Sequence, residues 1–136
     1  MLSKDISVVV QGPVCEVATV RCLKSIRECL PDSKIILSSW VGSDFSTVES
    51  LCDEVILSAD PGQIIQQRTM SGSKPKVRYS NINRQIVTTL SGLKRVNTKY
   101  VLKFRTDLAL CNAGFLNYFD SYQEYENKFK CVESRV

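Results

Sequence analysis

The sequence contains no histidine, and this absence excludes several kinds of active site. No Ser-His or Cys-His catalytic pair can form, so any acid–base chemistry would come from carboxylates, Tyr, Lys or Cys. No two of the six cysteines have the two-residue separation of a zinc knuckle. Because Cys15, Cys22 and Cys29 recur every seven residues along one helix stripe, we expect buried free thiols in a reducing compartment.

The chain also lacks a long apolar run and a strong excess of charge. The opening MLSKDISVVVQG is too short in its apolar part for a transmembrane helix and has no signal-peptide cleavage pattern, which predicts a cytoplasmic protein. The net charge of +4 permits an acidic ligand, but no basic block interleaved with aromatics indicates nucleic acid. A length of 136 residues with 43% hydrophobic residues predicts one soluble domain, residues 1–136.

Strand and helix patterns alternate along the sequence. Strands are expected at residues 6–10, 35–37, 54–57 and around 101. Helices are expected around 20–30, at 45–51 after a Ser43 or Asp44 cap, after Asn81 with an apolar line of Ile82, Ile86, Leu90 and Leu93, and at 113–129. This alternation predicts an α/β fold, with a mainly parallel sheet in the order 3-2-1-4 and helices on both faces.

Residues 62–80 have the least regular composition. They include SGSKPKVRYS, which carries four Lys and Arg with the neighbouring Arg68 and no acid. A solvated loop is one interpretation of this segment, and a mobile basic flap over a phosphate is the other.

Ligands of parallel sheets bind beyond the carboxyl ends of the strands, and four short segments should meet there. They are residues 11–13, Trp40 with Gly42 and Asp44, residues 60–62, and residues 105–107. A dinucleotide loop is not among them, because QGPVCE has a single glycine. Arg84 begins a helix, where a cation opposes the helix dipole unless an anion lies beside it.

The strand within KYVLKFRTDLAL carries a row of charge on one face, formed by Lys103, Arg105 and Asp107. Two interpretations remain open. If the strand lies at the sheet edge, these side chains face water. If it is central, Lys103 and Arg105 must be paired with carboxylates or with a bound phosphate.

Several of these stretches together resemble the WavE lipopolysaccharide-synthesis family. They are QGPV, SIRECLPDSKIILSSW with Gly42 and Asp44, CDEVILSADPG, NINRQIVTTLSGLK and YVLKFRTDLAL, which span residues 6 to 119. The resemblance implies a glycosyltransferase with a Rossmann-like nucleotide-sugar-binding fold of the GT-A type. It also implies a role in lipopolysaccharide or other cell-surface glycan synthesis, at the inner face of the membrane.

The resemblance assigns roles to individual residues. Gln11, Gly12 and Asp60 would contact the nucleoside, and Arg84 the diphosphate or the sugar. Asp107 matches the last acid of the family type's metal-binding motif, where a carboxylate holds Mn²⁺ or Mg²⁺ on the diphosphate. Arg105 stands where that motif has another acid, so Arg105 with Lys103 could neutralise phosphate without a metal.

The resemblance also implies partners and a missing part. A nucleotide-sugar donor and a glycan or lipid-linked acceptor are expected, with peripheral membrane association and no nucleic acid. Only 29 residues follow Asp107, fewer than such transferases use for acceptor contacts and a base. We therefore expect an N-terminal, donor-binding portion that needs a C-terminal half or a second subunit. The alternatives are a non-catalytic nucleotide-binding or assembly module, and a Rossmann-like domain similar only in architecture.

Overall fold

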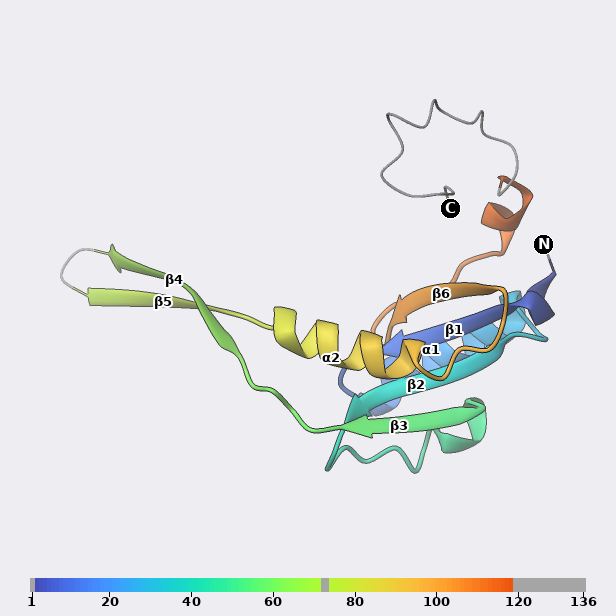
Figure 1. Cartoon of the computed structure of the whole chain (residues 1–136), viewed down its shortest axis with the longest axis horizontal. Helices are drawn as coiled ribbons and strands as arrows, with labels where there is room; N and C mark the ends of the chain where they lie inside the picture. The colour runs from blue at the N-terminus through green and yellow to red at the C-terminus, as the bar shows by residue number, and fades with distance from the viewer. Residues whose placement is uncertain (1, 72–73, 119–136) are drawn as a thin grey trace.

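The computed structural model describes residues 2–71 and 74–118. Its main sheet contains β1 (Ile6–Gln11), β2 (Lys34–Trp40), β3 (Glu54–Ser58) and β6 (Tyr100–Arg105), all parallel (Figure 1). The helices are α1 (Glu16–Cys29) and α2 (Ile82–Leu93), and β4 (Ile64–Ser71) pairs with β5 (Lys74–Ser80) in a separate sheet. Short 3₁₀ helices lie at η1 (Ser3–Asp5), η2 (Glu49–Leu51) and η3 (Gly114–Tyr118).

The strand order of the main sheet is β3-β2-β1-β6. These are the four strands expected from the sequence, so the predicted order 3-2-1-4 is confirmed once the additional pair β4–β5 is left out of the numbering. Val8 of β1 pairs with Ile35 on one side and Leu102 on the other. Because all four strands run in the same direction, their carboxyl ends meet at one edge, where the predicted site residues lie.

Helix α1 covers an apolar face of the sheet. Leu23 and Ile26 of α1 are fully buried in one cluster with Val8, Val10 and Leu37. Three-residue spacing places Leu23 and Ile26 on one side of the helix, while alternation places Val8 and Val10 on one side of β1. This cluster is the core of the protein.

Helix α2 packs against the opposite face of the sheet through small and polar residues. Thr88 and Gly92 are fully buried there, and a Cβ on Gly92 would overlap Val9 Cγ1. The Ser38 hydroxyl donates to the Thr88 carbonyl at 2.8 Å. The predicted helix is therefore confirmed, but its apolar line lies away from the sheet and does not enter the core.

The expectation of a solvated loop at residues 62–80 was wrong, while the alternative of a mobile basic flap over a phosphate stays a prediction. This segment forms the antiparallel hairpin β4–β5, which projects from the rest of the protein (Figure 1). The pairing shifts by one residue between Ile65 and Gln67. Its many Lys, Arg, Ser and Gly residues suggested a loop, but alternation and cross-strand pairing override composition here.

One predicted helix is shorter than expected, and another lies mostly outside the described residues. The segment 45–51 contains only the 3₁₀ turn η2, and Asp44 accepts hydrogen bonds from the Ser46 backbone and hydroxyl in a tight local turn. Near the C-terminus, η3 occupies the start of the expected helix 113–129, and residues 119–129 lie outside the described residues. Asn81 does precede α2 as predicted, but its side chain caps no backbone amide.

The cysteines are free where the structure describes them, but not all are buried. Cys22 is fully buried, and desolvation raises the pKa of its thiol to about 12, with a smaller effect from Asp107. Cys15 and Cys111 are exposed, contrary to the expectation of buried thiols, and Cys131 lies outside the described residues. Nowhere in residues 2–71 and 74–118 is there a helix with the length and apolar character needed to cross a membrane.

Candidate functional site

A cleft of about 470 Å³ lies at the carboxyl edge of the main sheet. It is bounded by the ends of β1, β2 and β6, the turn after β3, and the first turns of α2. All six predicted site residues line it: Gln11, Gly12, Asp60, Arg84, Arg105 and Asp107. Its other lining residues are Pro13, Cys15, Trp40, Asn81, Gln85 and Thr106.

The floor of the cleft is the end of β1 and the turn that follows it. Gln11 is 4% exposed, and its Oε1 accepts a hydrogen bond of 2.9 Å from the Thr88 hydroxyl of α2. Gly12 has φ +135°, a conformation that other residues rarely adopt, and a Cβ there would lie 2.7 Å from Thr106 Oγ1. The cleft therefore reaches the backbone at Gly12 because no side chain is present.

One wall of the cleft is an ion pair between the turn after β3 and the start of α2. Arg84 donates two hydrogen bonds to Asp60, from Nε to Oδ1 at 2.7 Å and from an Nη to Oδ2 at 2.5 Å. This bidentate contact holds the pKa of Asp60 below its usual value and raises the pKa of Arg84. The anion expected beside Arg84 is thus supplied by Asp60 within the chain, while Arg84 also reaches Asn81 Oδ1 at 3.0 Å.

The opposite wall carries a second pair of the same kind. Arg105 donates to both carboxylate oxygens of Asp107, at 2.9 and 2.7 Å, and this contact lowers the pKa of Asp107. About half of each side chain is exposed. β6 is an edge strand and Lys103 is exposed, which agrees with the interpretation that the charged face of this strand contacts water. Arg105 and Asp107, at the end of the same face, nevertheless line the cleft.

The donor set at Asp107 limits how a metal could bind. Among the described residues, no group of three or more His, Cys, Asp or Glu side chains is placed to hold a metal ion. Mg²⁺ often uses only one or two protein carboxylates and completes its shell with phosphate oxygens and water. Asp107 fits that minimal role, provided that Arg105 releases the carboxylate.

Thr88 is the residue that sequence reasoning missed. It lies on the side of α2 opposite to the apolar line, and its hydroxyl also contacts the Arg84 carbonyl oxygen at 2.8 Å. Its position places α2 against Gln11. Nothing in the sequence signalled it, because Thr88 lies on the polar side of the helix, and the apolar side of an amphipathic helix is normally the buried one.

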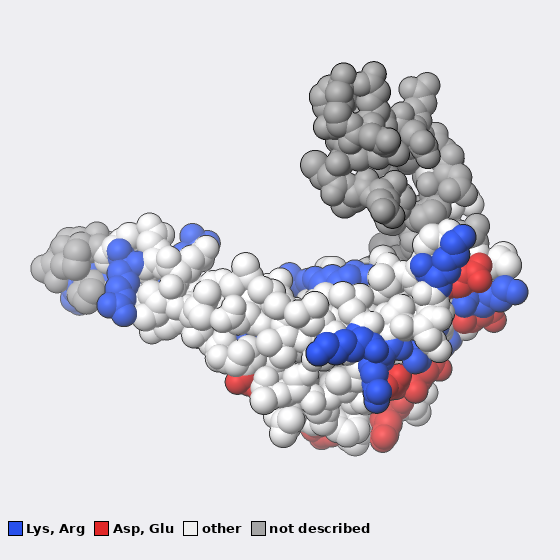
Figure 2. All heavy atoms as spheres, in the orientation of Figure 1, with Lys and Arg blue, Asp and Glu red and all other residues white. Residues whose placement is uncertain are grey.

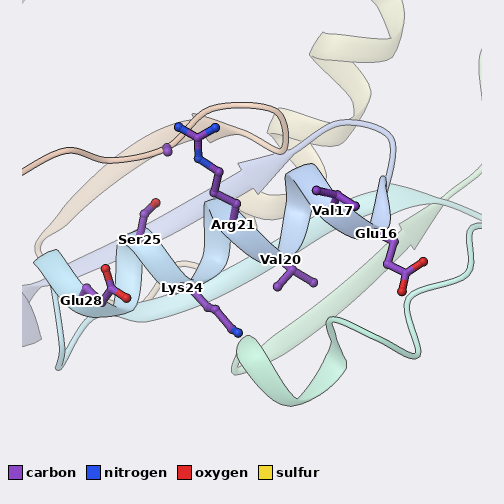
Figure 3. A pocket seen from close by; sticks show the side chains of 8 residues that line it. Glu16, Val17, Val20, Arg21, Lys24, Ser25 and Glu28 are labelled. Atoms are coloured by element: carbon purple, nitrogen blue, oxygen red, sulfur yellow. The ribbon is translucent and has the colours of Figure 1, made fainter.

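A second and larger hollow, of about 630 Å³, runs along the outer surface of α1. Figure 3 shows that its side chains fan out along the helix, with Arg21, Lys24 and Glu28 pointing in different directions. A ligand site needs polar groups that converge on one point. None of the predicted residues line this hollow, so the smaller cleft at the sheet edge is the candidate site.

The comparisons with known proteins give one match. A family model described as WavE lipopolysaccharide synthesis matches residues 6–136. No curated protein and no solved structure matches the chain.

Proposed function

Because the chain belongs to the WavE lipopolysaccharide-synthesis family, we propose that it binds a nucleotide-activated sugar as a glycosyltransferase or its donor-binding portion. The acceptor would be a glycan or a lipid-linked glycan. This assignment goes beyond the family description and is supported by the chemistry of the cleft.

The observation that carries the proposal is the pair of arginines on facing walls of one cleft. Arg84 and Arg105 each present a guanidinium fork to a carboxylate. The same planar fork matches two oxygens of a phosphate, so each arginine is preorganised for an anion of that shape. Two such groups around about 470 Å³ suit a diphosphate within a nucleotide-sized ligand.

The remaining lining residues suit the other parts of a nucleotide sugar. The half-buried Trp40 offers an aromatic surface for a base. Amides of Gln11, Asn81 and Gln85 offer donors and acceptors for the base edge or for sugar hydroxyls. Asp107 is the residue that would hold Mn²⁺ or Mg²⁺, which would neutralise charge on the diphosphate.

One observation favours the alternative, a nucleotide-binding module without turnover. Among the described residues that line the cleft, the only carboxylates are Asp60 and Asp107, and each is paired with an arginine. Their pKa values are lowered by these hydrogen bonds. A general base works best with a pKa near the working pH, so neither carboxylate is suited to that role.

Calorimetric titration of the 136-residue chain with nucleoside diphosphates, with and without Mn²⁺ or Mg²⁺, tests the proposal. We expect weak binding that improves with metal. Arg84→Ala should weaken binding of the diphosphate more than that of the nucleoside, while Arg21→Ala on α1 is the matched control and should change neither. Asp107→Asn should remove the improvement caused by metal.

No binding at millimolar ligand, with or without metal, would contradict the proposal. Binding that Arg84→Ala leaves unchanged would place the ligand elsewhere. If binding occurs, transfer of sugar to an acceptor in the presence of the donor separates a transferase from a module without turnover.

A further inference from the structure

Charge is distributed very unevenly along the chain. The stretch 61–106 contains ten of the eighteen Lys and Arg residues and none of the fourteen Asp and Glu residues. The rest of the chain therefore carries eight cations and fourteen acids. This acid-free stretch forms the hairpin β4–β5, helix α2 and the edge strand β6.

Helix α2 exposes its apolar side. Ile82, Ile86, Leu90 and Leu93 are 51%, 49%, 52% and 36% exposed. They lie opposite the buried Thr88, so the ridge points directly away from the sheet. Figure 2 views the molecule from this side and shows uncharged atoms over α2, with cations on the hairpin. If only water covered the outer side of α2, polar residues would be expected on that side and apolar residues against the sheet.

The hairpin is amphipathic as well. Lys74, Lys76 and Arg78 alternate with Val77 and Tyr79 along β5, so these three cations lie on one face of the hairpin and the apolar residues on the other, together with Arg68, which pairs with Val77. Ile65 pairs with Tyr79 and extends the apolar face. These three apolar side chains are exposed.

Most cations of the stretch are available to a partner. Three of them are engaged, by Asp60, Glu54 and Asp107. Arg68, Lys74, Lys76, Arg78, Lys94 and Lys103 are exposed and form no ion pair with the described residues. Exposed apolar side chains flanked by Lys and Arg, with no acid among them, are what an anionic bilayer surface attracts.

We propose that the basic apolar face, made of the α2 ridge, the cation-bearing face of the hairpin β4–β5 and Lys94, docks on an anionic lipid bilayer. The ridge would enter the boundary between headgroups and acyl chains, and the cations would contact lipid phosphates. A symmetric contact with a second copy fits less well, because it would bring the same cations of both copies together without any acid between them.

The docking surface is separate from the donor cleft and does not depend on the proposed function. The cleft pairs its arginines within the chain, whereas the exposed cations of this face form no ion pair within residues 2–71 and 74–118. Lipid binding can be measured without any nucleotide. A failure to bind nucleoside diphosphates would therefore leave this inference standing, and the reverse also holds.

Vesicle sedimentation of the full chain tests the inference. We expect binding to vesicles with 30% phosphatidylglycerol, little binding to pure phosphatidylcholine, and weaker binding as salt increases. Lys76→Glu with Arg78→Glu should reduce the partition coefficient at least about fivefold per removed cation. Arg21→Glu with Lys24→Glu is the matched control, because it removes one exposed Arg and one exposed Lys from α1 with the same change in net charge.

The apolar part is tested with Ile86→Gln and Leu90→Gln. These positions are half exposed, so the circular dichroism spectrum should be unchanged while binding that persists at high salt is lost. If both charge-reversal variants lost vesicle binding equally, net charge alone would explain the binding, and the proposal would be overturned. No binding to anionic vesicles, or equal binding to neutral ones, would also overturn it. So would a stable dimer that the glutamine substitutions dissociate, because the second copy would then be the occupant.

Discussion

The two helices cover the two faces of one sheet in opposite ways. Helix α1 buries Leu23 and Ile26 in the apolar cluster that contains Val8, Val10 and Leu37. Helix α2 buries Thr88 and Gly92, and its Ile and Leu residues lie outside. Both helices have apolar residues at three- and four-residue spacing. Periodicity therefore identifies a helix and its apolar side, but not what that side contacts.

The physical reason lies in the residues of β1 and β2 that face α2. Ser38 and Gln11 present polar groups there, which must be satisfied by hydrogen bonds when they are buried. The Thr88 hydroxyl and carbonyl provide these bonds, and Gly92 lets the helix approach Val9. A ridge of Ile and Leu could do neither. The sheet face covered by α1 thus supplies most of the apolar burial, whereas the contacts on the face covered by α2 position the residues of the cleft.

The largest test of this difference compares matched truncations of the two helices. Leu23→Ala should lower the free energy of unfolding by about 2 to 5 kcal/mol, because it leaves a cavity in the core. Leu90→Ala removes the same atoms from an exposed position and should change it by about 0.5 kcal/mol or less. Urea unfolding of both variants decides the matter. Equal losses would mean that the ridge is buried.

The close approach of α2 to the sheet can be tested at Gly92. Gly92→Ala should destabilise the protein by about 1 to 3 kcal/mol, because the added methyl group overlaps the Val9 side chain. Without that contact the same substitution in a helix would be stabilising. The neighbouring Thr89→Ala is the control and should have a small effect. Increased stability of Gly92→Ala in urea unfolding would rule out the close contact.

The polar link between α2 and the cleft can be tested with Thr88→Val, which keeps the side-chain shape. Loss of the hydrogen bond to Gln11 should cost about 1 kcal/mol in the free energy of unfolding. It should also weaken nucleotide binding in the calorimetric titration, because Gln11 forms the floor of the cleft. Ser33→Ala removes a buried hydroxyl at the opposite, amino end of the sheet, where the Ser33 hydroxyl bonds only the Leu30 carbonyl among the described residues, and should leave nucleotide binding unchanged. If Thr88→Val bound nucleotide as well as the wild type, the contact between α2 and Gln11 would not contribute to the binding site.

The smallest expected effect concerns the two exposed arginine–carboxylate pairs. The pKa values of Asp60 and Asp107 are lowered in the folded protein, by hydrogen bonds from Arg84 and Arg105. Their stabilisation is therefore present above the unfolded pKa and is lost as the pH falls through the folded pKa. The double variant Asp60→Asn, Asp107→Asn should have a slightly lower urea midpoint than the wild type at pH 7. The difference should shrink below about pH 4, and a difference that grows on acidification would have the wrong sign.

Much of the site could be predicted because it follows from topology. The residues after β1, β3 and β6 had to meet once the strands were recognised as parallel, and Gln11, Asp60 and Asp107 do line one cleft. The pairing within the cleft could not be predicted. Arg84 binds a carboxylate 24 residues away, and nothing in either local sequence indicates it. The hairpin β4–β5 was missed for a related reason, because cross-strand partners rather than composition stabilise it.

The sequence by itself determined the strands of the main sheet, their order and the edge at which the site forms. Apolar runs and helix periods are local properties, and right-handed crossovers then restrict the order of parallel strands. Only the tertiary structure decided that α2 turns its Ile and Leu residues outward. That choice depends on the fit of Thr88 and Gly92 against Gln11, Ser38 and Val9, which lie some fifty or more residues earlier in the chain. Side-chain fit across such separations exists only after the chain has folded.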